Sequence, residues 1–252
     1  MAMEEKWVFI TGSNGGIGSE LVRRFASAGY HIYAHSRKTS EEWEEGLDHI
    51  RSEYGIQVLP VCFDLTDSEK MKECMQQMLR EKKQIDVLVN NAGMMHAGLF
   101  QMTEMETIRR VFDVNLFAAM ELTQWVIRSM VRKKKGSIVN ILSIAGLDLG
   151  LGQCAYGVSK AAMGAFTKTL ASELSNYGIR VNGVAPGFTD TKMAQSEELR
   201  REREMIESGK GAFCRLAKPE EIAETVFFLA SDASSFVNGQ IIRVDGGNKC
   251  KL

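Results

Sequence analysis

The sequence has few prolines, no clustered cysteines and no long hydrophobic run. Only three of its 252 residues are proline, and no stretch rich in Pro, Gly and Ser separates two domains. The five cysteines form no CxxC pair, which excludes a dense disulfide framework and favours reduced thiols. Because no run of about eighteen apolar residues occurs, a membrane-spanning helix is not predicted and we expect a cytoplasmic protein.

An excess of charge of either sign is absent too. The chain contains thirty-one Lys and Arg residues and thirty-two Asp and Glu residues, which gives a formal net charge of -1. A nearly neutral chain has no general attraction for nucleic acid or acidic membranes, so we expect neither as a partner. The four histidines show no metal-ligand spacing with the cysteines, and no metal site is predicted.

What remains is the composition of an ordinary globular protein. Hydrophobic residues make up 44% of the chain and charged residues 25%. This length suits one α/β domain, and we expect residues 1–252 to form a single unit. The least regular stretch, residues 187–215, is a candidate substrate lid.

Short apolar runs rich in β-branched residues alternate with longer segments of helical periodicity. Strands that are apolar throughout are buried on both faces, and interleaved helices supply the crossovers between parallel strands. The pattern predicts an α/β Rossmann-type fold, a doubly wound parallel seven-stranded sheet with helices on both faces. We expect strands at 7–11, 31–35, 56–63, 85–93, 136–142, 179–187 and 240–247, and helices at 17–28, 40–54, 67–81, 103–132, 155–177, 192–208 and 219–231.

A glycine-rich turn, "TGSNGGIG", follows the first predicted strand directly. Gly12, Gly16 and Gly18 let the backbone approach a pyrophosphate, which the N–H groups at the start of the next helix stabilise. The spacing departs from G-x-G-x-x-G, so the prediction of a nucleotide site rests on the strand–turn–helix context. A glycine turn with only structural duties is the alternative.

The second predicted strand ends in "AHSRK". In dinucleotide folds an acidic side chain at this point binds the ribose of NAD, whereas an Arg accommodates the 2′-phosphate of NADP. Arg37, with Lys38 and the Ser36 hydroxyl, offers a cation and no carboxylate. The sequence therefore favours NADP(H) over NAD(H), and a solvated charge pair at a loop is the alternative.

Tyr156 and Lys160 of "YGVSK" stand one helical turn apart, and Ser143 ends the strand before them. A lysine ammonium about 4 Å from a phenol contributes roughly 4 kcal/mol at an effective dielectric of 20, which would lower the phenol pKa toward neutrality. Tyr156 is therefore the predicted acid/base catalyst, Lys160 also reaches the nicotinamide ribose, and Ser143 bonds the substrate oxygen. A surface pair on a helix is the alternative.

Several motifs together resemble the short-chain dehydrogenase/reductase family over essentially the full chain. They are "TGSNGGIG", "NNAG", "DVNL", "SIAG" before "YGVSK", "VAPGFTDT" and "RVDGG". The resemblance implies that Asn115 of "DVNL" joins Ser143, Tyr156 and Lys160 as the fourth catalytic residue, holding Lys160 and a proton-relay water. Within the family, "PGFTDTKM" and "RLAKPEEIAETVFFLASD" look most like 3-oxoacyl-[acyl-carrier-protein] reductases of fatty acid biosynthesis.

The resemblance implies an NADP(H)-dependent oxidoreductase that moves hydride between nicotinamide and a carbonyl or secondary alcohol, with 3-oxoacyl thioester reduction as the leading reaction. A dehydrogenase of hydroxysteroids, sugars or polyols, and a non-catalytic NADP(H)-binding protein, are the alternatives. Asp64 is expected against the adenine and Thr189 at the nicotinamide amide. The full set of expected cofactor contacts is Gly12, Ser13, Asn14, Gly16, Ile17, Gly18, Ser36, Arg37, Asp64, Leu65, Asn91, Ala92, Gly93, Tyr156, Lys160, Pro186, Gly187 and Thr189.

Partners follow from the same resemblance. The family usually forms tetramers through two long helices and the last strand, so a homotetramer is expected; a dimer, or burial within one subunit, is the alternative. The basic run "VRKKKG" is a candidate surface for an acidic carrier protein near the active-site mouth, although Tyr177 stands where such reductases often place a second docking Arg. Met94, Met95 and His96 follow "NNAG" and are candidates for the pocket edge, but packing in the core or in a loop is the favoured interpretation.

Overall fold

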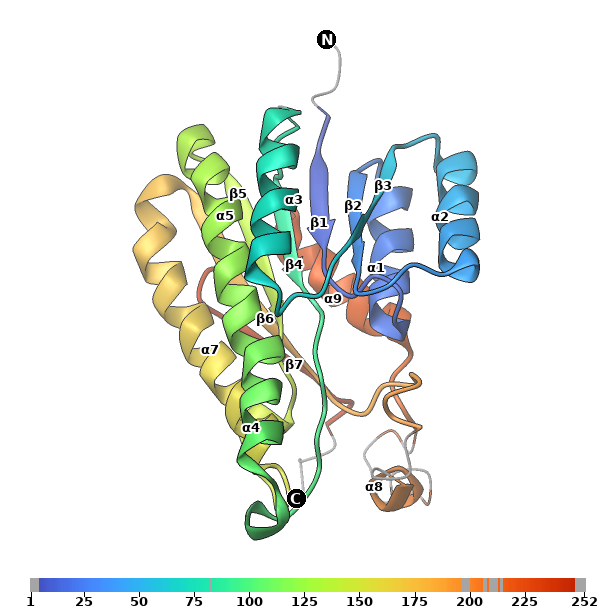
Figure 1. Cartoon of the computed structure of the whole chain (residues 1–252), viewed down its shortest axis with the longest axis vertical. Helices are drawn as coiled ribbons and strands as arrows, with labels where there is room; N and C mark the ends of the chain where they lie inside the picture. The colour runs from blue at the N-terminus through green and yellow to red at the C-terminus, as the bar shows by residue number, and fades with distance from the viewer. Residues whose placement is uncertain are drawn as a thin grey trace.

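Seven strands form one parallel sheet in the order β3-β2-β1-β4-β5-β6-β7 (Figure 1). The computed structural model describes residues 5–81, 83–195, 200–205, 208, 213 and 215–247. This arrangement confirms the predicted Rossmann-type doubly wound sheet. The strands are β1 (Trp7–Ile10), β2 (His31–Ser36), β3 (Val58–Cys62), β4 (Val87–Asn90), β5 (Gly136–Ile141), β6 (Ile179–Pro186) and β7 (Ile241–Val244).

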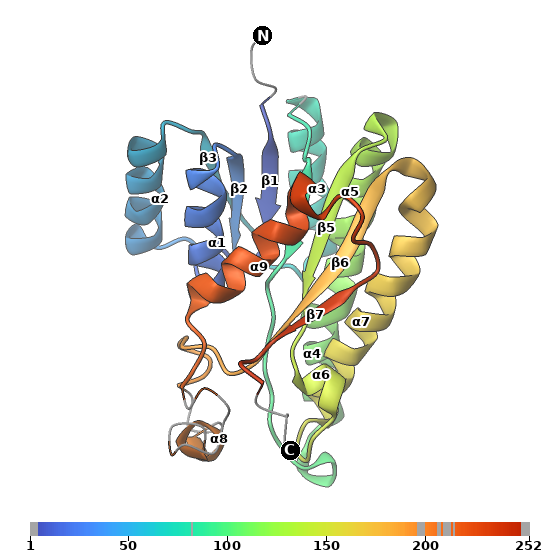
Figure 2. The same ribbon diagram turned by 180° about the vertical axis from the view of Figure 1, so that it is seen from behind.

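Helices cover both faces of the sheet (Figures 1 and 2). Apolar side chains of β1, β4 and β5 pack with α1 (Gly16–Ser27), α2 (Glu41–Tyr54) and α9 (Pro219–Ala230) on one face. The apolar side chains on the opposite face of the sheet pack with α3 (Ser68–Arg80), α5 (Ala118–Lys133) and α7 (Cys154–Leu174). Because the central strands are buried on both faces, β1 is apolar at every position and β4 at every position but Asn90, which is why their hydrophobic pattern located them.

The helix expected at 103–132 is not one regular helix. It follows a short 3-10 turn, η1 (Phe100–Met102), and consists of α4 (Met105–Phe112), a π-helical turn η2 (Asp113–Phe117) and α5. The wider turn changes which side chains face the sheet and buries Asn115 beside Leu116. Among the described residues, no helix is long and apolar enough to cross a membrane.

Three further short elements, α6 (Ala145–Asp148), η3 (Ser175–Tyr177) and α8 (Arg200–Met205), lie in the second half of the chain. The four-residue helix α6 was not predicted, and η3 ends the helix expected to reach 177. Within the helix expected at 192–208, the described residues include α8, and residues 196–199, 206 and 207 lie outside the described residues. The same holds for the candidate lid, 187–215, whose role stays a prediction.

Candidate active site

A cavity of about 1050 Å³ opens at the carboxyl ends of the strands. The strand order reverses beside β1, which pairs with both β2 and β4. Ligands of doubly wound sheets bind at such a reversal point, because the connections leave in opposite directions and open a crevice. The walls are formed by the segments that follow β1 to β6 and by residues of α4 and α7.

The glycine turn after β1 is shaped for a close ligand. Gly12 has a φ of 66°, a left-handed conformation that favours glycine. A Cβ added to Gly18 would overlap the Gly12 carbonyl oxygen, and one added to Gly16 would lie 2.6 Å from Thr191 Cγ2. Within the described part of the chain, no side chain caps the N-terminus of α1, so its first N–H groups face the cavity as anion donors.

His35 supports this turn from below, a role that the sequence analysis missed. The Gly12 N–H donates to His35 Nδ1 at 3.4 Å, so the ring proton is on Nε2, which donates to the Phe63 carbonyl at 3.0 Å. Burial lowers the pKa of His35 to about 4, so the ring is neutral. The Ser13 hydroxyl donates to the His35 carbonyl at 3.0 Å and lies behind the cavity wall.

The far end of the cavity carries the predicted adenosine contacts. Arg37 and Asp64 line it, and Arg110 of α4, which the sequence analysis did not single out, joins them. The Thr66 N–H donates to Asp64 at 3.0 Å and lowers the pKa of that carboxyl, with Arg37 and Arg110 acting in the same direction. The buried Ser36 hydroxyl donates to the Lys38 carbonyl at 2.7 Å, so it is turned into the loop.

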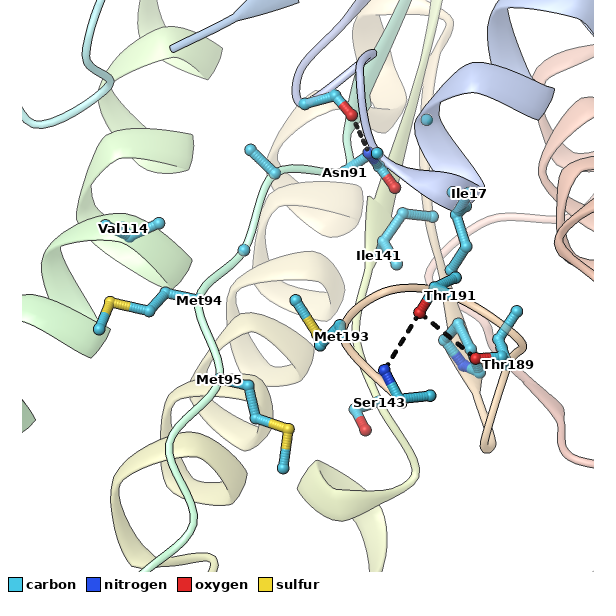
Figure 3. A pocket seen from close by; sticks show the side chains of 18 of the residues that line it. Ile17, Asn91, Met94, Met95, Val114, Ile141, Ser143, Thr189, Thr191 and Met193 are labelled. Atoms are coloured by element: carbon cyan, nitrogen blue, oxygen red, sulfur yellow. Dashed lines mark hydrogen bonds between the residues drawn. The ribbon is translucent and has the colours of Figure 1, made fainter. Parts of the chain in front are cut away.

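Asn91 joins the ends of β1 and β4. Its side-chain amide donates to the carbonyls of Thr11 at 2.9 Å and Gly12 at 3.1 Å. The Thr11 hydroxyl accepts from the backbone N–H groups of Asn91 and Ala92 at 2.9 Å each. These bonds hold the "NNAG" segment against the glycine turn, and Figure 3 shows Asn91 beside it.

Ser143, Tyr156 and Lys160 converge on the opposite wall, as predicted. The Ser143 hydroxyl accepts from the Ala145 N–H at 3.1 Å and acts on the nearby Tyr156 phenol to lower its pKa. Lys160 is 3% exposed, and its Nζ donates to the Ile141 carbonyl at 2.8 Å and lies 6.0 Å from the centre of the Tyr156 ring. One turn of α7 therefore places the phenol in the cavity wall and the ammonium group beneath it.

The expected effect of Lys160 on the tyrosine is wrong for this structure. Desolvation raises the pKa of Tyr156, and the nearby Ser143 hydroxyl opposes that rise only in part. Burial also lowers the pKa of Lys160 to about 8, because the ammonium group has left water. Burial, which disfavours the charged phenolate, has the largest effect on the Tyr156 pKa, and the Lys160 ammonium group is hydrogen bonded to the Ile141 carbonyl. The phenol is therefore held protonated, as a proton donor must be.

Asn115 lies behind this wall, on the π-helical turn. Its Oδ1 accepts from the Met94 N–H at 2.7 Å, and its Nδ2 donates to the Met94 carbonyl and the Ser159 hydroxyl, each at 2.9 Å. A Cβ added to Gly93 would lie 3.3 Å from both Asn115 Oδ1 and Lys160 Nζ. The bare Gly93 thus lets both groups approach the "NNAG" backbone, and the catalytic role of Asn115 stays a prediction.

Most of the predicted site residues line one cavity. Ser13, Ser36 and Asn115 lie behind its wall, and His96 bonds Thr103 at 3.2 Å outside it. Several residues that line the cavity were not predicted from the sequence. Gln153 is one of them, and its position one helical turn before Tyr156 could have predicted it. Met94 and Met95, for which packing was the favoured interpretation, line the cavity as well. Those that line the cavity as expected are Gly12, Asn14, Gly16, Ile17, Gly18, Arg37, Asp64, Leu65, Asn91, Ala92, Gly93, Ser143, Tyr156, Lys160, Pro186, Gly187 and Thr189.

An ion triad fixes the loop that carries Ser143. Arg243 of β7 donates to both carboxylate oxygens of Asp148, at 2.9 and 2.8 Å, and to Asp245 at 2.5 Å. Asp148 is the last residue of α6, five residues after Ser143, and Asp245 packs against Gly187. The Ile144 N–H also donates to the Pro186 carbonyl at 3.0 Å. The triad therefore ties the loops after β5, β6 and β7 together.

The basic run 132–135 is not at the mouth of this chain's cavity. It ends α5 and precedes β5, whereas Ser143 follows the other end of that strand. Figure 1 shows the end of α5 at the edge of the sheet where β1 begins, away from the cavity. Lys133 forms an ion pair with Asp86 there, at 3.2 Å. The expected carrier surface beside the mouth is wrong within a single chain.

The sequence was next compared with known proteins. The profile of the short chain dehydrogenase family matches residues 6–202. The chain belongs to this family. A 3-oxoacyl-[acyl-carrier-protein] reductase, FabG of Thermotoga maritima, is 39% identical over 98% of this chain and 99% of its own. A 7alpha-hydroxysteroid dehydrogenase of Bacteroides fragilis is 36% identical over 97% of this chain and 94% of its own.

Among solved structures, "ElxO with NADP Bound" superposes with a TM-score of 0.85 at 30% identity, covering 97% of this chain and 99% of its own. The geometry of the site is consistent with a short-chain dehydrogenase. A glycine turn, an arginine after β2 and a set of Ser, Tyr and Lys side chains line one cavity. Among the described residues, no group of three or more His, Cys, Asp or Glu side chains is placed to hold a metal.

Proposed function

We propose that this short-chain dehydrogenase is an NADP(H)-dependent reductase of 3-oxoacyl thioesters. The observation that carries the proposal is that Ser143, Tyr156 and Lys160 line the same cavity as the glycine turn. The similarity to a 3-oxoacyl-[acyl-carrier-protein] reductase over nearly the whole of both chains supports the choice of substrate.

The residues present fit the cofactor. Gly12, Gly16 and Gly18 line the cavity at the start of α1, where the N–H groups of a helix N-terminus can bind a pyrophosphate. Arg37 and Arg110 flank the far end, where two guanidinium groups suit a 2′-phosphate better than a bare ribose. Bound there, NADPH supplies the hydride that the reduction requires.

Three side chains complete the chemistry. The Ser143 hydroxyl donates a hydrogen bond to the substrate carbonyl and stabilises the charge that develops on its oxygen. Tyr156 gives its proton to that oxygen, so that the ketone becomes a secondary alcohol. Lys160, with a pKa of about 8, is charged near neutral pH and stabilises the phenolate that remains. Asn115 holds the backbone of Met94 beside them.

A substrate panel tests the proposal. Purified protein is given NADPH with acetoacetyl-CoA or a longer 3-oxoacyl thioester, and NADP⁺ with hydroxysteroids, sugars or polyols, while absorbance of the reduced cofactor is followed. We expect thioester reduction to have the highest kcat/KM, by at least about tenfold. Turnover of a hydroxysteroid alone would replace the proposal with the reaction named for the Bacteroides fragilis relative.

We also propose that the protein works as a cytoplasmic homotetramer. Large apolar side chains are exposed on the π-helical turn η2, on α5 and on α7, namely Phe117 (55%), Met120 (36%) and Val158 (43%). Burial of such side chains between copies is favourable. Light scattering is expected to give about four times the chain mass of 28.1 kDa. A mass of one chain at micromolar concentration would contradict this.

A further inference from the structure

Exposed apolar side chains gather on two loops at the carboxyl edge of the sheet. The loop from β4 to α4 exposes Leu99 (39%), Phe100 (60%) and Met102 (79%). The loop from β5 to α7 exposes Leu149 (57%) and Leu151 (91%). We call these five side chains the apolar ledge. Single exposed apolar residues are common on proteins, but five on two adjoining loops mark a binding surface.

The backbone joins the two loops into one surface. The Gly98 N–H donates to the Gly152 carbonyl at 2.9 Å, and Gly98 and Gln153 form a parallel bridge. The Met102 N–H donates to the Leu99 carbonyl at 2.9 Å and closes a turn within the first loop. Both loops project at the same end of the molecule in Figures 1 and 2. The ledge is therefore held by backbone hydrogen bonds.

The ledge is continuous with the catalytic cavity. Gln153 directly follows the second loop and lines the cavity one turn before Tyr156. Met95 lines it just before the first loop, and Met193, 45% exposed, lines it from the loop after β6. Figure 3 shows Met95 and Met193 near Ser143. An apolar ligand that reaches the Tyr156 phenol meets these thioethers next and the ledge beyond them.

The ledge has no uncompensated charge. Between residues 97 and 103 and between 147 and 153 the only ionisable side chain is Asp148, and Arg243 binds both of its carboxylate oxygens. Such a surface suits a hydrocarbon chain and not a phosphate or a sugar. A site of about 1050 Å³ that also takes a dinucleotide leaves room for only the reacting end of a long substrate.

We propose that the apolar ledge binds the acyl chain of the substrate beyond its first four carbons. This inference rests on the proposed function, since it assumes a 3-oxoacyl thioester with its 3-oxo group at Tyr156. The enzyme then selects medium and long acyl chains over the acetoacetyl group, whose chain ends before it leaves the cavity. Each buried methylene contributes to binding, so selectivity grows with chain length.

Kinetics with acetoacetyl-CoA and 3-oxododecanoyl-CoA test the ledge. Leu151→Ser and Met102→Ser are compared with Phe236→Ser, a matched control on a fully exposed phenylalanine outside the ledge. The native protein should prefer 3-oxododecanoyl-CoA. Each ledge variant should lower kcat/KM for that substrate about tenfold, mainly through KM, and change kcat/KM for acetoacetyl-CoA by less than about twofold. Phe236→Ser should leave the ratio of the two values unchanged.

Three results would overturn the inference. An unchanged ratio of the two kcat/KM values in the ledge variants would show that the acyl chain does not bind the ledge. A change of mass in light scattering with Leu151→Ser or Met102→Ser, but not with Phe236→Ser, would make the ledge an interface between copies of the chain. If the native protein reduces neither thioester, the proposed function fails and the inference falls with it.

Discussion

At the scale of single residues, burial decides the charge state of the groups in and around the cavity. Lys160 is 3% exposed and has a pKa lowered to about 8, and desolvation raises the pKa of Tyr156. His35 is 1% exposed and has a pKa lowered to about 4. In each case burial shifts the pKa toward the neutral form because charge is poorly solvated there, although Lys160 is still charged near neutral pH. The site is thus set for a protonated phenol and a neutral imidazole.

The pKa of His35 predicts a loss of stability in acid. Its imidazole titrates near 6.5 in the unfolded chain and near 4 in the fold, so the unfolded state takes up the proton first as the pH falls. Stability from this group is present above pH 6.5 and is lost as the pH falls toward 4. From pH 7 to pH 5 the free energy of unfolding should drop by about 2 kcal/mol on account of His35.

Urea unfolding of three proteins at pH 7 and pH 5 measures this contribution. His35→Gln keeps a donor and an acceptor for Phe63 and Gly12 but does not titrate. It should lose about 2 kcal/mol less on acidification than the native protein does. His49→Gln is the control, because His49 is an exposed histidine on α2. The same pH dependence in native protein and His35→Gln would refute the assignment.

Arg37 is expected to select the cofactor. Its guanidinium group lines the adenosine end of the cavity, where an ion pair with a 2′-phosphate is only partly screened by solvent. Arg37→Ala should weaken NADPH binding about tenfold or more and change NADH binding by less than about twofold. Fluorescence titration of both cofactors gives the dissociation constants. Equal affinities for the two cofactors in the native protein would contradict the preference for NADP(H).

At the scale of elements, the sequence predicts best what local periodicity controls. The strands were located because their residues are buried on both faces, and the glycine turn because Gly12 needs a left-handed φ. The π-helical turn was missed, since the contacts that accompany it, from Asn115 to Met94 and Ser159, join residues far apart in sequence. Periodicity carries no information on such contacts.

Contacts between charged residues far apart in sequence could not be predicted from the sequence either. Arg243 and Asp148 are 95 residues apart in sequence, so no motif announced their ion pair. The basic run 132–135 was visible in the sequence, but its place at the opposite edge of the sheet depends on the direction of β5. The predicted pKa shift of Tyr156 was wrong because spacing along a helix says nothing about desolvation.

The ion triad should hold the Ser143 loop in position. Arg243→Met removes the bonds to Asp148 and Asp245, which frees α6 from β7. We expect kcat for thioester reduction to fall about tenfold, with less than about threefold change in NADPH affinity. Arg243→Lys should restore part of kcat, because it keeps the charge but not the two-oxygen contact with Asp148.

Arg24→Met is the matched control for the triad. Arg24 lies 2.7 Å from Glu224 and joins α1 to α9, on a pair of helices that do not carry Ser143. Its loss should change stability but leave kcat within about twofold. An equal fall of kcat in Arg24→Met and Arg243→Met would show that the triad acts only through global stability.

At the scale of the whole molecule, the carboxyl ends and the amino ends of the strands carry different surfaces. The carboxyl edge holds the glycine turn, the Ser–Tyr–Lys set and the apolar ledge, because the loops after parallel strands meet there (Figure 1). The other edge holds the basic run and the start of β1. A parallel sheet separates these surfaces by the length of its strands. All proposed chemistry is thus confined to one edge.

The central claim is that Tyr156 gives the proton in a reduction carried out in this cavity. The most direct measurement combines NADPH oxidation by a 3-oxoacyl thioester with NADPH affinity, in native protein and in Tyr156→Phe. Loss of the hydroxyl removes the proton donor but leaves the ring in the wall, so turnover should fall at least about thousandfold while the dissociation constant of NADPH stays within about twofold. Undiminished turnover in Tyr156→Phe would contradict the account.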